Sequence, residues 1–145
     1  MSHGLRGRRL ARDEGFKALY RHEVAGESVP DLIDELRRLL VTDGDAGDYA
    51  AHLVTLFDLN REEVDRAIES ALDRWTLARV AQTDLGVLRL AGTELLFCPE
   101  VPFKVVIDEA IELARRYGTD ASGRFVNGVL DTVARRAREA PKAEA

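Results

Sequence analysis

The amino-acid sequence predicts an all-α protein with about seven helices. Three observations support this fold class. Apolar residues recur at helical spacing along almost the whole chain, capping and helix-breaking residues separate the apolar stripes, and no segment alternates in the manner of a strand. With 145 residues, the chain is long enough for one domain and too short for two of ordinary size. We therefore expect one helical domain.

The individual helices follow from the apolar stripes in chain order. The first helix is expected to begin near Arg8. Each later stripe predicts a helix that buries one face. The stripes are Leu32, Ile33, Leu36, Leu39 and Leu40; Tyr49, Leu53, Leu56 and Phe57; Val64, Ile68, Ala71, Leu72 and Trp75; Val106, Ala110, Leu113 and Tyr117; and Val126, Val129, Leu130, Val133 and Ala137.

The boundaries between these helices are marked by capping and breaking residues. Pro30 opens one helix, Asn60 is placed to cap another, and Gly118 follows a third as a helix-ending glycine. Pro99 and Pro102 end the segment before them and leave a short loop. These signals agree with the limits of the stripes.

The segment 84–97 differs from the others because it is apolar on all sides, a pattern typical of a helix buried among other helices. Gly86 and Gly92 lie inside it, where each costs about 1 kcal/mol relative to alanine. A close approach of a neighbouring helix would offset that cost, so we expect this helix to be the central one of the C-terminal half. The run TDGDAGD at 42–48 is expected to form a surface loop. The apolar residues of the central segment are Leu85, Val87, Leu88, Leu90, Ala91, Leu95, Leu96 and Phe97.

Composition limits the class of protein. The hydrophobic fraction of 46% and the charged fraction of 32% are typical of a globular chain. A single cysteine, Cys98, argues against a disulfide framework or a cysteine-based zinc site and suits a reducing cytosol. No apolar run reaches the ~18 residues needed to span a membrane, and no apolar stretch follows the basic N-terminus as in a signal peptide. We expect a cytoplasmic protein.

Catalytic signals are weak, so the sequence does not indicate an enzyme, a metal site or a cofactor. The three histidines show no spacing that would pair them as ligands or as a base with a nucleophile. Cys98 is more readily explained as a small buried residue than as a nucleophile. The aspartates of the 42–48 loop lack the glycine and glutamate that a calcium-binding loop requires. Helix capping and loop solvation explain them better.

The N-terminal segment carries an excess of positive charge. Residues 1–21 hold six basic and two acidic side chains, a net charge of +4, so that the remaining residues carry −9 of the total of −5. This layout suggests a nucleic-acid or membrane contact, and a solvated surface is the alternative. The six basic residues are Arg6, Arg8, Arg9, Arg12, Lys17 and Arg21.

Three of these arginines lie where a helix disfavours them. Arg8, Arg9 and Arg12 fall in the first turns of the expected helix, and each costs about 0.3–1 kcal/mol against the helix dipole at low salt. The like charges of Arg8 and Arg12, four residues apart, add a small penalty. Local rules that are broken without visible compensation tend to mark functional sites. A bound polyanion would supply the compensation, whereas an arm with solvated charges is the other interpretation.

Aromatic residues near basic ones suit single-stranded RNA, which is bound by phosphate neutralisation and by stacking of bases on rings. Tyr20 follows the arginines on the same helix. Phe125 lies near the start of the last helix, between Arg124 and the nearby Asn127. By default each ring is expected to belong to the core. A role in stacking on an RNA base is the alternative interpretation.

Two segments resemble the NusB family of transcription antitermination proteins. The run RRLARDEGFKALY at 8–20 resembles the arginine-rich first helix of the family, and VPFKVVIDEAIELARRYGTDASGRFVNGVLDTVA at 101–134 closely resembles its C-terminal signature. The run VLRLAGTELL at 87–96 is similar to the central helix of the family. The resemblance extends from residue 6 to about 138, with residues 24–75 similar in helix pattern more than in identity.

The resemblance implies a single domain, 1–145, made of two small helical bundles at roughly 6–58 and 59–138, with a frayed tail at 139–145. It also implies binding of boxA RNA in nascent ribosomal transcripts, together with NusE, a small-subunit ribosomal protein, within an RNA polymerase antitermination complex. By position, Asp84 is expected to face NusE. With the basic and polar neighbours described above, the predicted RNA-binding residues are Arg6, Arg8, Arg9, Arg12, Lys17, Tyr20, Arg124, Phe125 and Asn127.

Departures from the family pattern leave the RNA footprint open. Leu10 stands where a third consecutive arginine can occur, Gly15 where alanine is usual, and Lys17 where glutamine is usual. Ala121 replaces an acidic residue near the RNA side. The expected function is a non-enzymatic RNA-binding adaptor that supports ribosomal RNA transcription. The alternative is a helical protein–protein adaptor whose arginines contact an acidic partner.

Overall fold

The computed structural model describes residues 5–139 and contains seven α-helices, with no strand in that range. This confirms the all-α class and the expected number of helices. A 3₁₀ turn, η1 (Leu77–Arg79), lies between the fourth and fifth helices. The α-helices are α1 (Leu5–Ala25), α2 (Val29–Leu39), α3 (Ala46–Leu59), α4 (Arg61–Ala71), α5 (Gln82–Phe97), α6 (Phe103–Tyr117) and α7 (Ser122–Glu139).

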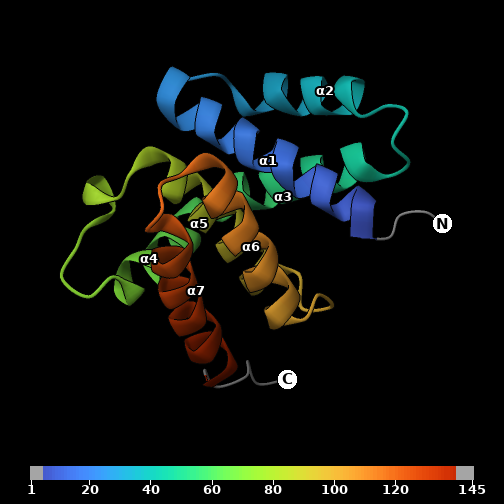
Figure 1. The fold of residues 1–145 in the computed structure, drawn as a ribbon. Coiled ribbons are helices and arrows are strands. Elements are labelled where there is room, and N and C mark those ends of the chain that lie inside the picture. Colours follow the sequence, from blue (N-terminus) through green and yellow to red (C-terminus); the bar gives the residue numbers. More distant parts are fainter. Residues whose placement is uncertain (1–4, 140–145) are drawn as a thin grey trace.

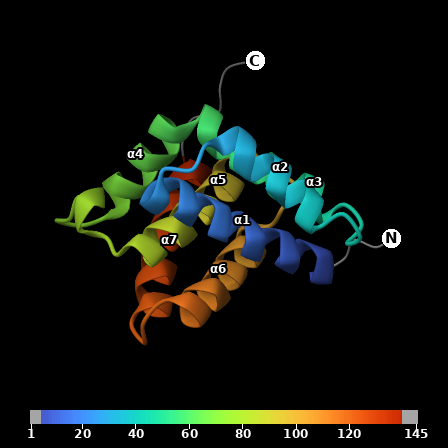
Figure 2. The ribbon, with the colours of Figure 1, turned by 90° about the horizontal axis from the view of Figure 1, so that it is seen from above.

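The helices form two groups that meet along α1, α3 and α5 (Figure 1). In the first group α2 packs on α3 and α1. In the second, α6 and α7 form a pair beside α5, while α4 packs on α5 and α7. The view from above shows α1 crossing over the second group (Figure 2). A division of the chain at residues 58 and 59 stays a prediction.

Helix α5 is the central helix, as its all-round apolar pattern predicted. It contacts α1, α3, α4, α6 and α7, and its residues from Leu85 to Leu95 are all buried. The expected close approach is found at Gly86, where an added Cβ would lie 2.9 Å from the Phe16 ring of α1. An added Cβ at Gly15 of α1 would lie 3.1 Å from Leu90. Glycine at position 15 therefore fits the close packing of α1 on α5.

The helix boundaries partly follow the sequence signals. Helix α2 begins one residue before Pro30, and the Ser28 side chain caps it by accepting a hydrogen bond from the Asp31 backbone N–H at 3.2 Å. Asn60 stands at the α3–α4 junction, but its side chain donates to the Leu56 carbonyl at 2.9 Å instead of capping α4.

The prediction that Trp75 belongs to a buried helical stripe is wrong. Helix α4 ends at Ala71, and Leu72 adopts an extended backbone that turns the chain away. Trp75 lies in the connection to α5 with 54% of its surface exposed. The helical spacing of apolar residues continues in the sequence past the end of α4. Leu72, directly after the helix, is still buried, but Trp75 is not, because the backbone has already left the helical path.

A buried arginine of α5 joins three helices of the core. The Arg89 side chain is 7% exposed. It donates to Asp65 of α4 at 2.9 and 3.0 Å and to Glu23 of α1 at 2.7 Å. A buried charge with good partners on both sides fixes the relative positions of the helices that supply them. Arg89 therefore links the end of α1 to α4.

Across the described residues, no helix is both long and apolar enough to cross a membrane.

The two glycines of α5 should respond differently to substitution by alanine. Gly86→Ala puts a Cβ against the Phe16 ring, so we expect a loss of about 1–3 kcal/mol in the free energy of unfolding. Gly92→Ala is the matched control, because its Cβ would meet Val64 at an ordinary 3.5 Å. The control should be neutral or gain up to about 1 kcal/mol from helix propensity. Urea unfolding of both variants measures the difference, and equal stabilities would contradict the close approach.

Candidate nucleic-acid interface

The first turn of α1 presents arginines to two neighbouring helices. Because α1 begins at Leu5, three residues before the expected start, Arg6, Arg8 and Arg9 all lie near its N-terminus, and no acidic residue of α1 shares that turn. Arg6 is exposed. Arg9 turns toward α6, while Arg8 turns toward α3. The start of α1 therefore displays positive charge over a broad surface.

Residues of other elements balance the charges of Arg8 and Arg9. The expectation that these arginines have no compensating partner within the protein is therefore wrong. The Arg9 Nε lies 3.0 Å from a carboxylate oxygen of Glu109 on α6. The Arg8 guanidinium stacks over the Tyr49 ring at 3.7 Å and lies 3.8 Å from Asp45. Sequence reasoning considered only neighbours on the same helix, whereas these partners come from α3, its preceding loop and α6.

Arg12 is part of the core. Its side chain is 4% exposed and forms a two-pronged ion pair with Glu94 of α5, at 2.8 and 2.7 Å. The Tyr49 hydroxyl donates to the same carboxylate at 2.5 Å. Burial, together with the hydrogen bond to Glu94, raises the pKa of Tyr49 well above its usual range, so that the hydroxyl remains a donor. Arg12 therefore lies beneath Arg8 and Arg9 instead of beside them at the surface.

A surface hollow of about 480 Å³ lies between α1 and α6. Arg9 lines it from α1, and Arg115 and Arg116 line it from the last turn of α6. Arg116 donates to Asp13 at 2.8 Å, and Lys17 pairs with the same carboxylate at 3.2 Å. Lys17 is thus joined through Asp13 to the edge of this surface.

Sequence reasoning missed Arg115 and Arg116. Basic residues in the last turn of a helix are favoured by its dipole and give no signal of function. The structure connects them to the predicted site, because the Arg115 side chain lies 3.3 Å from the position of a Cβ at Gly123, in the first turn of α7. The arginines of α6 therefore lie between Arg9 and the start of α7.

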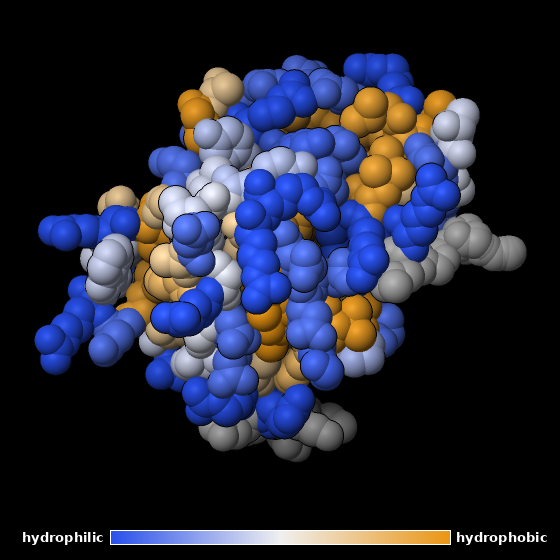
Figure 3. Space-filling model, in the orientation of Figure 1, coloured by the Kyte–Doolittle hydropathy of each residue, from blue (hydrophilic) through white to orange (hydrophobic). Residues whose placement is uncertain are grey.

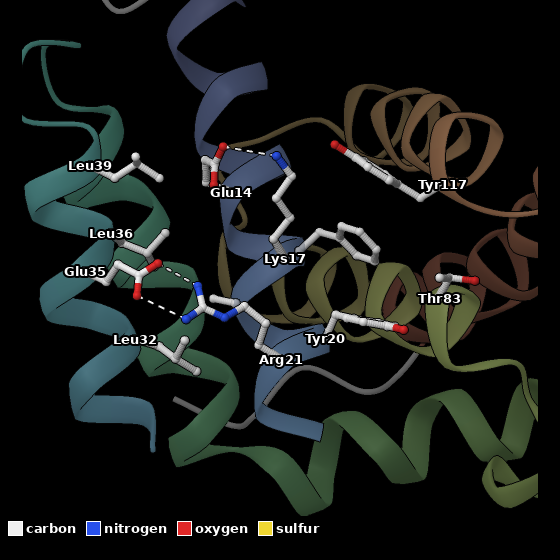
Figure 4. Close-up of a pocket in the computed structure, with 12 residues that line it drawn as sticks. Glu14, Lys17, Tyr20, Arg21, Leu32, Glu35, Leu36, Leu39, Thr83 and Tyr117 are labelled. Atoms are coloured by element: carbon white, nitrogen blue, oxygen red, sulfur yellow. Dashed lines mark hydrogen bonds and ion pairs between the residues drawn. The ribbon is translucent and has the colours of Figure 1, made fainter. Parts of the chain in front are cut away.

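Tyr20 lies apart from the arginines. It is 12 residues beyond Arg8, about 18 Å along the helix axis, and lines a groove of about 390 Å³ with Thr83 of α5. In Figure 4, Lys17 pairs with Glu14 at one side of this groove, Arg21 pairs with Glu35 across it, and Tyr20 points toward Thr83. Figure 3 shows apolar surface over α2 and α1 at the upper right. Tyr20 is therefore closer to the start of α5 than to the arginine cluster.

The predicted residues of α7 face two different directions. Arg124 is exposed and Phe125 is half-buried, and both line a hollow beside the connection between α4 and α5. Asn127 is exposed and lines a separate hollow with Phe103 of α6, although it follows Arg124 by three residues and so is its neighbour on the helix surface. The structure thus places Arg124 and Phe125 on one hollow and Asn127 on another.

Asp84 lies in the first turn of α5 and borders the same hollow as Phe125. The N-cap position is Ala81, so Asp84 is the third residue of the helix and not its cap. One carboxylate oxygen, Oδ1, is buried without a hydrogen-bond partner among the described residues. A buried acceptor without a partner is uncommon. The side chain as a whole is half-buried, so the rest of the carboxylate is accessible from the hollow.

Within the described residues, no group of three or more histidine, cysteine, aspartate or glutamate side chains is arranged to hold a metal ion. Cys98 is buried. Burial, and then the nearby charge of Glu94, raises the pKa of its thiol to about 11. At neutral pH the thiol is therefore protonated and a poor nucleophile.

Comparisons with known proteins agree on one family. The NusB family model matches residues 9–135. The transcription antitermination protein NusB of Anaeromyxobacter dehalogenans is 44% identical over 128 residues, which cover 88% of this chain and 89% of that protein. T. maritima NusB is similar in structure, with a TM-score of 0.81, 43% identity, and coverage of 93% of this chain and 94% of that chain. A structure of antitermination factors NusB and NusE in complex with dsRNA contains a chain with a TM-score of 0.80 and 31% identity, covering 90% of this chain and 98% of that one.

The two classes of arginine in α1 should differ sharply in their effect on stability. Arg12→Ala leaves the Glu94 carboxylate buried without its partner, so we expect a loss of about 3–5 kcal/mol in the free energy of unfolding. Arg9→Ala is the matched control and should cost less than about 1 kcal/mol, because the Arg9 side chain is 58% exposed. Urea unfolding measures both. A stable Arg12→Ala variant would contradict a structural role for this ion pair.

Proposed function

The chain belongs to the NusB family of transcription antitermination proteins, and we propose that it binds boxA-type single-stranded RNA together with NusE. In this role it supports transcription of ribosomal RNA as part of an RNA polymerase antitermination complex. It acts as a non-enzymatic adaptor in the cytoplasm. The observation that carries the RNA part of the proposal is the cluster of surface arginines at the start of α1.

The proposed RNA surface runs from the start of α1 across the end of α6 to the start of α7. Arg8 and Arg9 neutralise phosphates at one end, and Arg124 and Phe125 contact the RNA at the other. Support for this path comes from Arg115, which lies against Gly123 and so bridges the two regions. Arg6, Lys17 and Asn127 extend the surface, whereas Arg12 contributes by holding α1 on α5.

RNA binding on this surface is an exchange of partners. The carboxylate of Glu109 faces Arg9, and Asp13 faces Arg116. Phosphate oxygens take the place of these carboxylates when the RNA docks. The arginine of each pair is more than half exposed, whereas the carboxylate is largely covered. Ion pairs that open to solvent contribute about 0–1 kcal/mol, so replacing them with arginine–phosphate pairs costs little.

The NusE surface is proposed to include Asp84. Its side chain is half-buried and borders an open hollow, so a basic or amide donor of NusE can reach the accessible part of the carboxylate. Tyr20 is close to this surface, because it shares a groove with Thr83, the neighbour of Asp84. Tyr20 therefore lies between the two proposed binding regions.

One observation favours the alternative function, a protein–protein adaptor with an acidic partner. Arg9 already pairs with a carboxylate at 3.0 Å, so an acidic protein segment would fit the same surface. RNA preference and salt dependence separate the two functions. A preference for boxA RNA over other RNA of equal charge is expected only for the antitermination function.

Removal of two surface arginines should flatten the salt dependence of RNA binding. For Arg8→Ala/Arg9→Ala, the slope of log affinity against log salt should fall by roughly 1.4, because each phosphate contact with single-stranded RNA contributes about 0.7. The measurement is fluorescence anisotropy with labelled boxA RNA. A double-stranded RNA of the same sequence is measured in parallel and should bind more weakly than the single strand.

The matched control is Arg66→Ala/Arg136→Ala, which removes the same charge from exposed sites on α4 and α7 outside the proposed interface. The control slope should equal that of the unmodified protein. Equal slopes for all three proteins would count against the arginine surface.

Loss of the Asp84 charge should weaken NusE binding and leave the fold intact. Asp84→Asn keeps the size of the side chain but removes a charge-assisted hydrogen bond, which is worth about 1.5–3 kcal/mol. The stability should change by less than about 1 kcal/mol, the value of one acid at a helix start. Calorimetric titration with NusE and thermal unfolding test this. Asp73→Asn, in the same hollow, is the control, and unchanged NusE affinity in Asp84→Asn would exclude Asp84 from the interface.

A further inference from the structure

The connection between α4 and α5 exposes an aromatic ring beside the proposed RNA surface. Trp75 is the only tryptophan in the sequence, and 54% of its surface is exposed. In Figure 1 this connection forms the loop at the left of the molecule, next to the start of α7. A large indole ring held at the surface is costly to leave uncovered and is enriched at binding sites.

Trp75 lines a hollow of about 620 Å³ together with residues of α4, η1, α5 and α7. Phe125 lines it from the start of α7, and Leu72 and Val80 form part of its apolar wall. Both of these aliphatic side chains are buried, at 8% and 6% exposure. The hollow therefore has a fixed apolar wall and two aromatic residues.

The rim of this hollow carries two cations, from Arg79 and Arg124, beside two carboxylates, from Asp73 and Asp84. Arg79 of η1 and Arg124 of α7 both line it and are exposed. A guanidinium beside an aromatic ring is a combination that single-stranded RNA sites use, with the ring for the base and the cation for the phosphate. The hollow is also continuous with the proposed RNA surface, because Arg124 and Phe125 belong to both.

We propose that this hollow holds one unstacked nucleobase of the bound RNA, with Trp75 as a stacking residue in addition to Phe125. The proposal rests on the proposed function, since it takes the bound molecule to be RNA. Arg79 and Arg124 hold the phosphates on either side of that base. A protein segment of NusE is the competing occupant, because Asp84 borders the same hollow.

The single tryptophan permits a direct test without a label on the protein. Intrinsic fluorescence is followed while boxA-type single-stranded RNA is added, and binding is measured in parallel by the anisotropy of labelled RNA. Stacking of a base on the indole should quench the emission in step with binding. The same titration with NusE alone provides the second arm.

The outcomes separate this inference from the proposed function. Binding of RNA with unchanged tryptophan emission would overturn the inference and leave the function standing. Absence of RNA binding, with or without NusE, would overturn the proposed function itself. A change in emission with NusE alone, and none on addition of RNA, would assign the hollow to the protein partner and overturn the inference.

Variants give a second measurement. Trp75→Leu should weaken RNA binding roughly 5- to 100-fold, the equivalent of one lost base–ring stack, whereas Trp75→Phe should retain most of the affinity. Leu59→Ala is the matched control, because Leu59 is an apolar residue that is 73% exposed outside the hollow, and it should bind as the unmodified protein does. A lower melting temperature for Trp75→Leu with unchanged RNA affinity would show that the ring only shields Leu72 and Val80.

Discussion

The carboxylate of Glu94 lies where α1, α3 and α5 meet, and the positions of these helices depend on it. It accepts from Arg12 of α1 and from Tyr49 of α3, and all three side chains are buried. Neither charge can be removed alone without leaving the other in an apolar environment. A buried ion pair of this kind is a strict geometric requirement more than a source of net stability. It fixes the rotation of α1 about its own axis and so determines which side of α1 faces solvent.

The display of arginines on α1 follows from this requirement. With Arg12 directed inward, Arg8 turns toward α3 and Arg9 toward α6. One run of arginines thus serves both the interior and the surface of α1. Arg12 holds the helix in place, and Arg8 and Arg9 remain at the surface. The proposed RNA surface therefore needs no separate scaffold, because the core contact that closes the fold also orients its arginines.

Local patterns were sufficient to predict the helices but not the partners of charged residues. The central position of α5 could be predicted because its apolar residues surround it within one short segment. The burial of Arg12 could not, since its partner Glu94 lies 82 residues away and nothing near Arg12 distinguishes it from Arg8. Trp75 continued an apolar spacing beyond the point where the backbone leaves the helix, so periodicity assigned it to the core. For the site, sequence similarity indicated the family and the likeness of the first and last helices. The place of Arg115 beside Gly123 depends on a tertiary contact, whereas the separation of Asn127 from Phe125, two residues away on one helix, follows from helix geometry.

The ion pairs on the proposed RNA surface also bear on selectivity. A transcription factor must find its target among abundant ribosomal and transfer RNA, all of which attract positive charge without regard to sequence. In the free protein the cation of Arg9 already faces Glu109, and that of Arg116 faces Asp13, while the chain as a whole carries a net charge of −5. Exchange of an internal carboxylate for a phosphate costs little but also gains little, so charge alone holds a random polyanion only weakly on the proposed surface.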